Sequence, residues 1–176
     1  MKKLELKDIC GYLPYELKVF DFESEVMYPF LGYEIDTTLT KILLYDEETD
    51  WWNLSNFKPI LRPATDLYKP IIHKRKEIVP IVELAKIATL CHGAEWRYKV
   101  DKKMAHFFDE IIPLSVQFLY DETSKRFYYR ENGEYRIPYN QYQLFDYLHE
   151  LKIDYRGLID AGLAISVHDL EFNPYN

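Results

Sequence analysis

The clearest hydrophobic pattern in this chain lies in residues 114–152, where strand-like alternation gives way to helical spacing. Three alternating segments are separated by turn sequences at Asp121–Ser124 and Asn132-Gly133, which predicts three antiparallel strands. Pro138 ends the third segment, and leucines then recur at helical spacing from Leu144 to Leu151. The pattern therefore predicts a three-strand meander followed by a helix that covers its apolar face.

The turn at Asn132-Gly133 allows two registers. A two-residue loop pairs Arg130 with Tyr135, whereas a three-residue loop with Gly133 in the left-handed region pairs Arg130 with Glu134. Only the longer loop separates apolar from charged positions, so we predict that loop. The predicted buried face then carries Phe118, Phe127, Tyr129, Tyr135 and Ile137. The predicted exposed face carries Arg126, Tyr128, Arg130 and Arg136.

The flanking turns favour the same division of faces. A four-residue loop over Asp121–Ser124 pairs Phe118 with Phe127 on the apolar side. After the third strand, Asn140 followed by Gln143 has the spacing of a capping box at the start of the helix.

The rest of the chain adds a second helix and several strands. Only Glu83, Lys86 and Thr89 interrupt the apolar sequence from Pro80 to Leu90, which predicts a helix near the centre of the core. Strands are predicted at residues 17–22, 39–45, 77–79, 95–100 and 163–167, with a less regular segment around 28–32. The two prolines in residues 57–63 predict an extended connection rather than a central strand. A short helix is predicted from Asp154 to Gly162. These elements predict an α+β fold with a mostly antiparallel sheet and two principal helices. The length favours a single domain over residues 1–176.

Composition indicates a soluble, cytoplasmic protein. No apolar run approaches the length of a membrane helix, and acidic residues near the N-terminus interrupt any signal-peptide core, so we expect no membrane association. Two cysteines form no disulfide framework. The net charge of −7 is uneven, because residues 51–106 are basic and the flanking segments acidic. We interpret this mainly as solvated faces that pair across the fold.

No catalytic or metal-binding motif is present. Cys91-His92 and His106 lack the paired spacing of structural zinc ligands. Asp46, Glu48 and Asp50 have the spacing of the first ligands of a calcium loop. Such a loop would need glycine at position 51 and glutamate at position 57, where this chain has Trp51 and Phe57. Nucleophile elbows and phosphate-binding loops are also absent from the sequence. We therefore predict no metal and no cofactor. An enzyme with scattered catalytic residues is the third choice of function.

Two surfaces remain as candidate binding sites. The first is the basic and aromatic strand face with Arg126, Tyr128, Arg130 and Arg136, where bases can stack on tyrosine and arginines can meet phosphates. The second is Trp51-Trp52, whose side chains would point to opposite faces of a strand, leaving one as an anchor for a partner. The acidic net charge disfavours nucleic acid, so a protein partner is preferred.

The passages DICGYLPYELKVF, FKPILRPATDL, EIVPIVELAKIA and RIPYNQYQLFDYLHELKIDYRGLIDAGLAI resemble a group of small uncharacterised proteins that are encoded by phages and mobile elements of gut Bacteroidetes. The resemblance spans most of the chain and implies a small cytoplasmic accessory protein, without implying an activity or a site. Together with the residues above, it favours macromolecular binding, with a protein as the preferred partner and single-stranded nucleic acid as the alternative.

Overall fold

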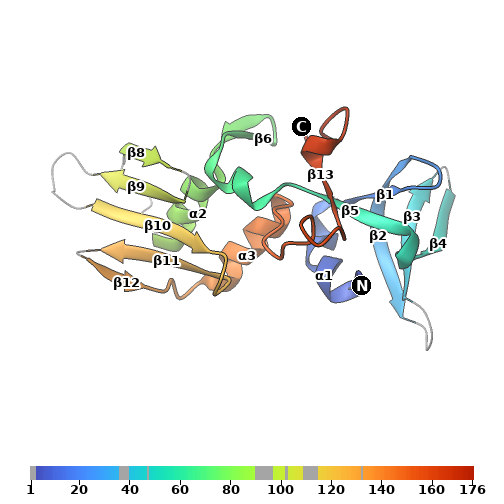
Figure 1. Cartoon of the computed structure of the whole chain (residues 1–176), viewed down its shortest axis with the longest axis horizontal. Coiled ribbons are helices and arrows are strands. Elements are labelled where there is room, and N and C mark those ends of the chain that lie inside the picture. The colour runs from blue at the N-terminus through green and yellow to red at the C-terminus, as the bar shows by residue number, and fades with distance from the viewer. Residues whose placement is uncertain are drawn as a thin grey trace. The chain divides into compact units, whose positions relative to one another are not determined.

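The computed structural model describes residues 3–35, 40–46, 48–89, 97–101, 103–108, 115–131 and 133–176. The chain forms two compact units. Unit 1 comprises Met1–Pro63 and Lys152–Pro174, and unit 2 comprises Ala64–Leu151 and Tyr175–Asn176. Mostly antiparallel sheets with a meander and helices confirm the predicted α+β class (Figure 1). The single domain stays a prediction.

Unit 1 is built on a six-stranded sheet in the order β13-β5-β1-β2-β3-β4. Its strands are β1 (Lys18–Asp21), β2 (Met27–Ile35), β3 (Thr40–Asp46), β4 (Glu48–Asn53), β5 (Phe57–Leu61) and β13 (Ile165–Ser166). Short helical segments are α1 (Leu6–Ile9), η1 (Cys10–Tyr15), η2 (Leu54–Asn56) and η4 (Val167–Asp169). Neighbouring strands are antiparallel, except that β13 runs parallel to β5. The core includes Ile9, Tyr12, Leu17, Ile42 and Ile60, all fully buried.

Two predictions for the strands of unit 1 are wrong. Residues 28–32, expected to be irregular, lie within β2, which has a bulge between Phe30 and Gly32. The segment with Pro59 is a central strand, β5, although prolines normally exclude such a position. Pro59 is paired only with Val19 of β1, while β13 pairs only with residues 60–61 of β5. Proline is tolerated because β1 and β13 pair with different residues of β5, so the missing N–H of Pro59 does not interrupt the pairing with β13.

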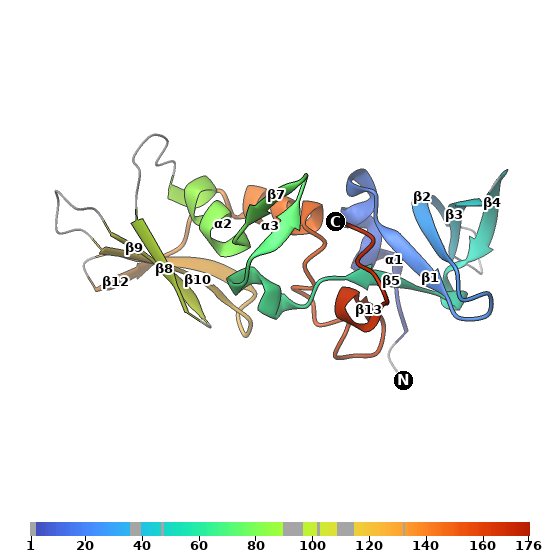
Figure 2. The ribbon, with the colours of Figure 1, turned by 90° about the horizontal axis from the view of Figure 1, so that it is seen from above.

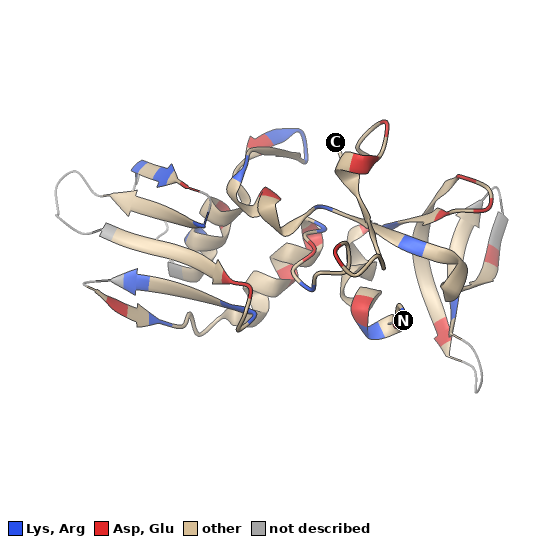
Figure 3. Ribbon diagram, in the orientation of Figure 1, with Lys and Arg blue, Asp and Glu red and all other residues tan. Residues whose placement is uncertain are grey.

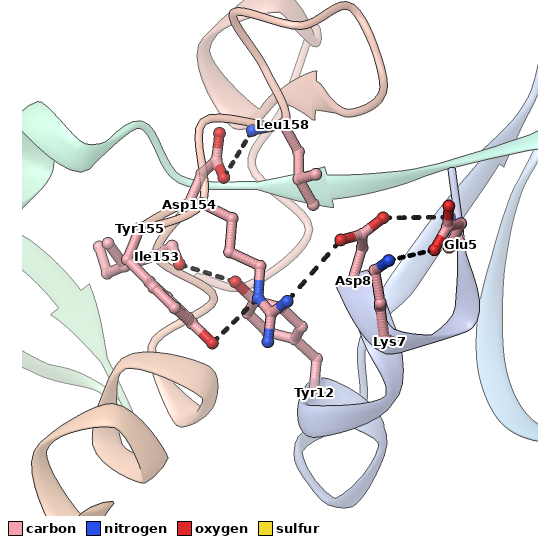
Figure 4. A network of polar contacts seen from close by, with 9 residues as sticks. Glu5, Lys7, Asp8, Tyr12, Ile153, Asp154, Tyr155 and Leu158 are labelled. Atoms are coloured by element: carbon pink, nitrogen blue, oxygen red, sulfur yellow. Dashed lines mark hydrogen bonds and ion pairs between the residues drawn. The ribbon is translucent and has the colours of Figure 1, made fainter. Parts of the chain in front are cut away.

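A buried polar network ties residues 152–159 to the N-terminal helices of unit 1 (Figure 4). The Tyr12 hydroxyl donates a buried hydrogen bond of 2.9 Å to the carbonyl of Ile153. The guanidinium of Arg156 lies 3.7 Å from the carboxylate of buried Asp8. The predicted helix that begins at Asp154 is wrong: the segment consists of turns, and the Asp154 carboxylate instead accepts hydrogen bonds from two backbone amides at residues 158 and 159. The network is structural, because its polar groups bond to one another.

Unit 2 contains a five-stranded antiparallel sheet in the order β12-β11-β10-β9-β8. Its strands are β8 (Arg97–Val100), β9 (Met104–Phe108), β10 (Ser115–Asp121), β11 (Arg126–Glu131) and β12 (Glu134–Arg136). The other elements are η3 (Ala64–Tyr68), the hairpin β6 (Ile71–His73) and β7 (Lys76–Ile78), α2 (Pro80–Thr89) and α3 (Gln141–Glu150). Figures 1 and 2 show α2 and α3 on the same side of the sheet. The predicted meander followed by a helix is confirmed as β10-β11-β12-α3.

Aromatic packing joins the sheet to α3. Phe127 is fully buried, and its ring lies 5.6 Å from that of Phe118, 5.0 Å from that of Tyr120 and 5.6 Å from that of Phe145 on α3. The side-chain amide of Gln141 accepts a hydrogen bond from the Phe127 N–H and donates one to the Phe127 carbonyl, at 3.0 and 3.1 Å. The first turn of α3 is therefore fixed to the backbone of β11.

The prediction for α2 is confirmed over Pro80–Thr89, where Ile81 and Leu84 are fully buried; Leu90 lies outside the described residues. The capping box at Asn140 is wrong. Asn140 precedes α3, but its side-chain amide donates to the carbonyl of Ile87, at 3.0 Å, and to Gln143, at 2.9 Å. It therefore connects the start of α3 to the end of α2. In the described part of the chain, no helix has the length and apolar character needed to cross a membrane.

Both predicted hairpin registers of the meander are wrong, with different consequences. The first hairpin pairs Phe118 with Tyr129 and Asp121 with Arg126, two residues away from the predicted register. A shift of two residues keeps every side chain on its predicted face. The second hairpin pairs Tyr129 with Arg136 and Arg130 with Tyr135, the register of the shorter loop.

Because the second register is shifted by one residue, Arg136 and Tyr135 exchange faces. Arg136 lies on the side of Phe127, and Tyr135 lies on the side of Arg130. The burial of Phe118 and Phe127 is confirmed, whereas the predicted burial of Tyr135 and Ile137 is wrong, with 58% and 47% of these residues exposed.

Candidate binding face

The face of the five-stranded sheet opposite α2 and α3 is the candidate site, and we call it the open face. Strand alternation fixes its membership, because neighbouring residues point to opposite sides and paired residues to the same side. Phe118 and Phe127 face the helices, so the residues next to them along β10 and β11 point to the other side of the sheet. The open face carries Arg97, Lys99, Met104, His106, Phe108, Gln117, Leu119, Asp121, Arg126, Tyr128, Arg130 and Tyr135.

A row of polar and aromatic residues crosses all five strands of the open face. Lys99 pairs with His106, His106 with Gln117, Gln117 with Arg130, and Arg130 with Tyr135. Adjacent strands lie about 4.8 Å apart, so the row is roughly 19 Å long. Gln117 Nε2 lies 3.5 Å from His106 Nδ1, and the guanidinium of Arg130 lies over the Tyr135 ring, 5.3 Å from its centre. These contacts hold neighbouring side chains of the row in place.

Apolar and aromatic side chains flank this row on both sides. On one side, two residues further along the strands, Met104 pairs with Leu119 and Leu119 with Tyr128. The Tyr128 hydroxyl lies 3.3 Å from that of Ser124. On the other side Phe108 is 44% exposed and stacks on His106, with an interplanar angle of 9°. Successive same-face residues on a strand are about 6.7 Å apart, so flat side chains lie close beside the polar row.

Among the described residues, the open face carries four lysines and arginines, while the carboxylate of Asp101 lies 3.1 Å from His106 and Asp121 is paired with Arg126. In Figure 3 the basic positions of the sheet lie on β8, β11 and β12, and those on β8 and β11 belong to this face. Arg97, Lys99 and Arg126 are exposed, and Arg130 is half-buried.

Two carboxylates near the edges of this face are held in their own turns. The backbone amide of Lys103, followed by a hydrogen bond from His106, lowers the pKa of Asp101. The hydroxyl of Ser124 and the backbone amide of Thr123 lower the pKa of Asp121 in the same way. Both carboxylates are therefore ionised at neutral pH and accept hydrogen bonds from turn residues.

The two units carry very different charge. Residues 64–151 and 175–176 hold 13 lysines and arginines and 13 aspartates and glutamates, so unit 2 has no net charge. The remaining residues hold 9 basic and 16 acidic side chains, which places the whole net charge of −7 in unit 1. The acidic composition of the chain is therefore not a property of the unit that carries the open face.

The structure brings part of the predicted binding set together. Arg126, Tyr128 and Arg130 share the open face, whereas Arg136 lies on the opposite face of the same sheet. The sequence places Gln117 on the same face as Arg130, as the structure does, but does not assign Arg97, Lys99, His106, Phe108 and Tyr135 to this face. Alternation within residues 97–100 does place Arg97 and Lys99 on one side, but only the pairing of β8 and β9 with β10 joins them to the meander.

The predicted tryptophan pair lies in unit 1, on β4. Trp51 pairs with Leu43 and Trp52 with Ile42, so the two indoles point to opposite sides of the sheet. They are 45% and 40% exposed, and the Trp52 ring contacts that of Phe57 edge-on at 6.0 Å. Trp52 thus covers an edge of the core, and Trp51 is the more exposed member.

A second cluster of ionisable groups connects the β6–β7 hairpin to α3. Glu150 Oε1 lies 3.1 Å from His73 Nε2 and 2.5 Å from Lys74 Nζ. Burial raises the pKa of Glu150, but the hydrogen bonds from Lys74 and His73 outweigh burial and hold it below its ordinary value. Burial also raises the pKa of nearby Tyr147 to about 12, so this phenol stays protonated. This geometry is that of an ion-pair clamp on the hairpin.

Among the described residues, no group of three or more histidine, cysteine, aspartate or glutamate side chains is placed to hold a metal ion. Cys91 and His92, weighed above as zinc ligands, lie outside the described residues. No known protein family, curated protein or solved structure matches the chain.

Proposed function

We propose that this protein works by binding another macromolecule through the open face of unit 2, and that the partner surface is anionic. The observation that carries the proposal is the row from Lys99 to Tyr135, which aligns cationic and aromatic side chains across five strands. The resemblance to proteins of phages and mobile elements supports a cytoplasmic accessory role.

Electrostatic complementarity supports an anionic partner. Exposed cations on a rigid sheet attract and orient a negatively charged surface. Sequence reasoning favours a protein partner because of the net charge of −7, but that charge belongs to unit 1, and unit 2 is neutral overall. An acidic protein surface and a phosphate backbone therefore both satisfy the charge of this face.

Affinity capture from a lysate of the host tests the proposal with two variants of equal charge change. The first, Lys99→Glu with Arg130→Glu, alters the open face. The second, Lys86→Glu with Arg136→Glu, alters side chains that are 55% and 54% exposed and lie on α2 and on the opposite face of the sheet. We expect the parent and the second variant to retain the same macromolecule and the first variant to lose it. Equal retention by both variants would contradict the proposal.

A further inference from the structure

Resting on the proposed binding role of the open face, we infer that its ligand is a single-stranded nucleic acid. Proteins that bind single strands combine a positively charged track for the backbone with aromatic side chains on which bases stack. The open face has both features in parallel, with the polar row crossing the strands and flat side chains on either side of it.

The positions of the cations match a backbone that crosses the sheet. Lys99 and Arg97 lie on the edge strand β8, and Arg126 and Arg130 lie on β11, three strands away. Strand spacing places the two groups roughly 14 Å apart. The ligand must therefore span the sheet in an extended form, which suits a flexible single strand.

The aromatic side chains supply surfaces for the bases beside these cations. Tyr135 is 58% exposed and Phe108 is 44% exposed, while Tyr128 is half-buried with its hydroxyl near Ser124. Paired bases in a duplex are stacked on one another, so their faces are not accessible to these rings. An acidic peptide would meet the cations but would leave the aromatic surfaces without a matching flat partner, which favours nucleic acid over protein.

Fluorescence anisotropy with labelled oligothymidylate and oligouridylate of about 15 nucleotides tests the inference, at the upper end of known site sizes. The oligothymidylate annealed to its complement and a polyglutamate peptide of similar length serve as competing ligands. We expect both single strands to bind more tightly than the duplex or the peptide, and a difference between them to show whether DNA or RNA is preferred. Tyr128→Ala should weaken binding by roughly fivefold to 150-fold, the range expected for one lost base contact.

The salt dependence gives an independent readout. Four phosphate contacts predict that the logarithm of the binding constant falls with the logarithm of salt concentration with a slope of about −3, and Lys99→Glu with Arg130→Glu should reduce the slope by about half. Unchanged oligonucleotide binding by that variant, or equal binding of single strand and duplex, would overturn the inference. Binding of polyglutamate but neither oligonucleotide would overturn it while leaving the proposed function intact. If the proposed function itself is wrong, the variant of the open face will retain the same macromolecule from the lysate as the parent.

Discussion

Replacing Phe127 should destabilise the protein far more than replacing its neighbour Tyr128, because the two side chains lie on opposite faces of β11. Phe127 is fully buried and is surrounded by the rings of Phe118, Tyr120 and Phe145. Truncation to alanine removes the transfer free energy of the ring and leaves a cavity whose rigid walls cannot fully collapse. We expect Phe127→Ala to lower the free energy of unfolding by roughly 3–5 kcal/mol.

The matched change Tyr128→Ala should cost less than about 1 kcal/mol, because this ring is only half-buried and faces away from the helices. Urea unfolding followed by circular dichroism measures both values. If Phe127→Ala leaves too little folded protein, Phe127→Leu provides a milder version of the same test. Equal losses for Phe127 and Tyr128 would refute the assignment of the two faces.

Three further outcomes follow from the contacts. Leu84→Asp should cost several kcal/mol, since it places an unpaired charge at a fully buried position of α2; a melting temperature close to that of the parent would show that α2 is peripheral. Because the folded pKa of Glu150 lies below its ordinary value of 4.5, its stabilising contribution is complete above that value and is lost as the pH falls through the folded pKa. The stability difference between the parent and Glu150→Gln, measured by urea unfolding across this range, should therefore shrink on acidification, and a constant difference would argue against the ion-pair clamp. Calorimetry should show one cooperative transition if residues 1–176 form a single domain, and two separate transitions would contradict that prediction.

Burial decides which parts of the fold can be predicted from sequence. The sequence places Phe118 and Phe127 on the buried face correctly, because helices cover one face of β10 and β11. Only one of the two alternating sets of side chains on each strand can then point into the core. The residues of β12 are all exposed, so no buried face selects its register, and the preference of Asn-Gly for a two-residue loop decides it. Arg136 was misplaced for this reason.

The rest of the binding face depends on long-range pairing. Lys99 joins the face only because β8 pairs with β9, and β9 with β10 on the side away from β11. Local alternation predicts strands but carries no information on their order. The first hairpin shows a milder case, since its loop comprises residues 122–125, with Lys125 at a left-handed φ of 52°, instead of the predicted 121–124. Moving the loop by one residue shifts the strand pairing by two, so no side chain changes face.

The most direct test of the central claim is an NMR titration of the labelled protein with unlabelled oligothymidylate, following backbone amides residue by residue. We expect the largest shifts along the row of the open face, at Lys99, His106, Gln117, Arg130 and Tyr135. Amides around Trp51 and Trp52 in unit 1 should be unaffected. Shifts centred on unit 1 or on α2 and α3, or no shifts at saturating oligonucleotide, would contradict the claim that this face binds single-stranded nucleic acid.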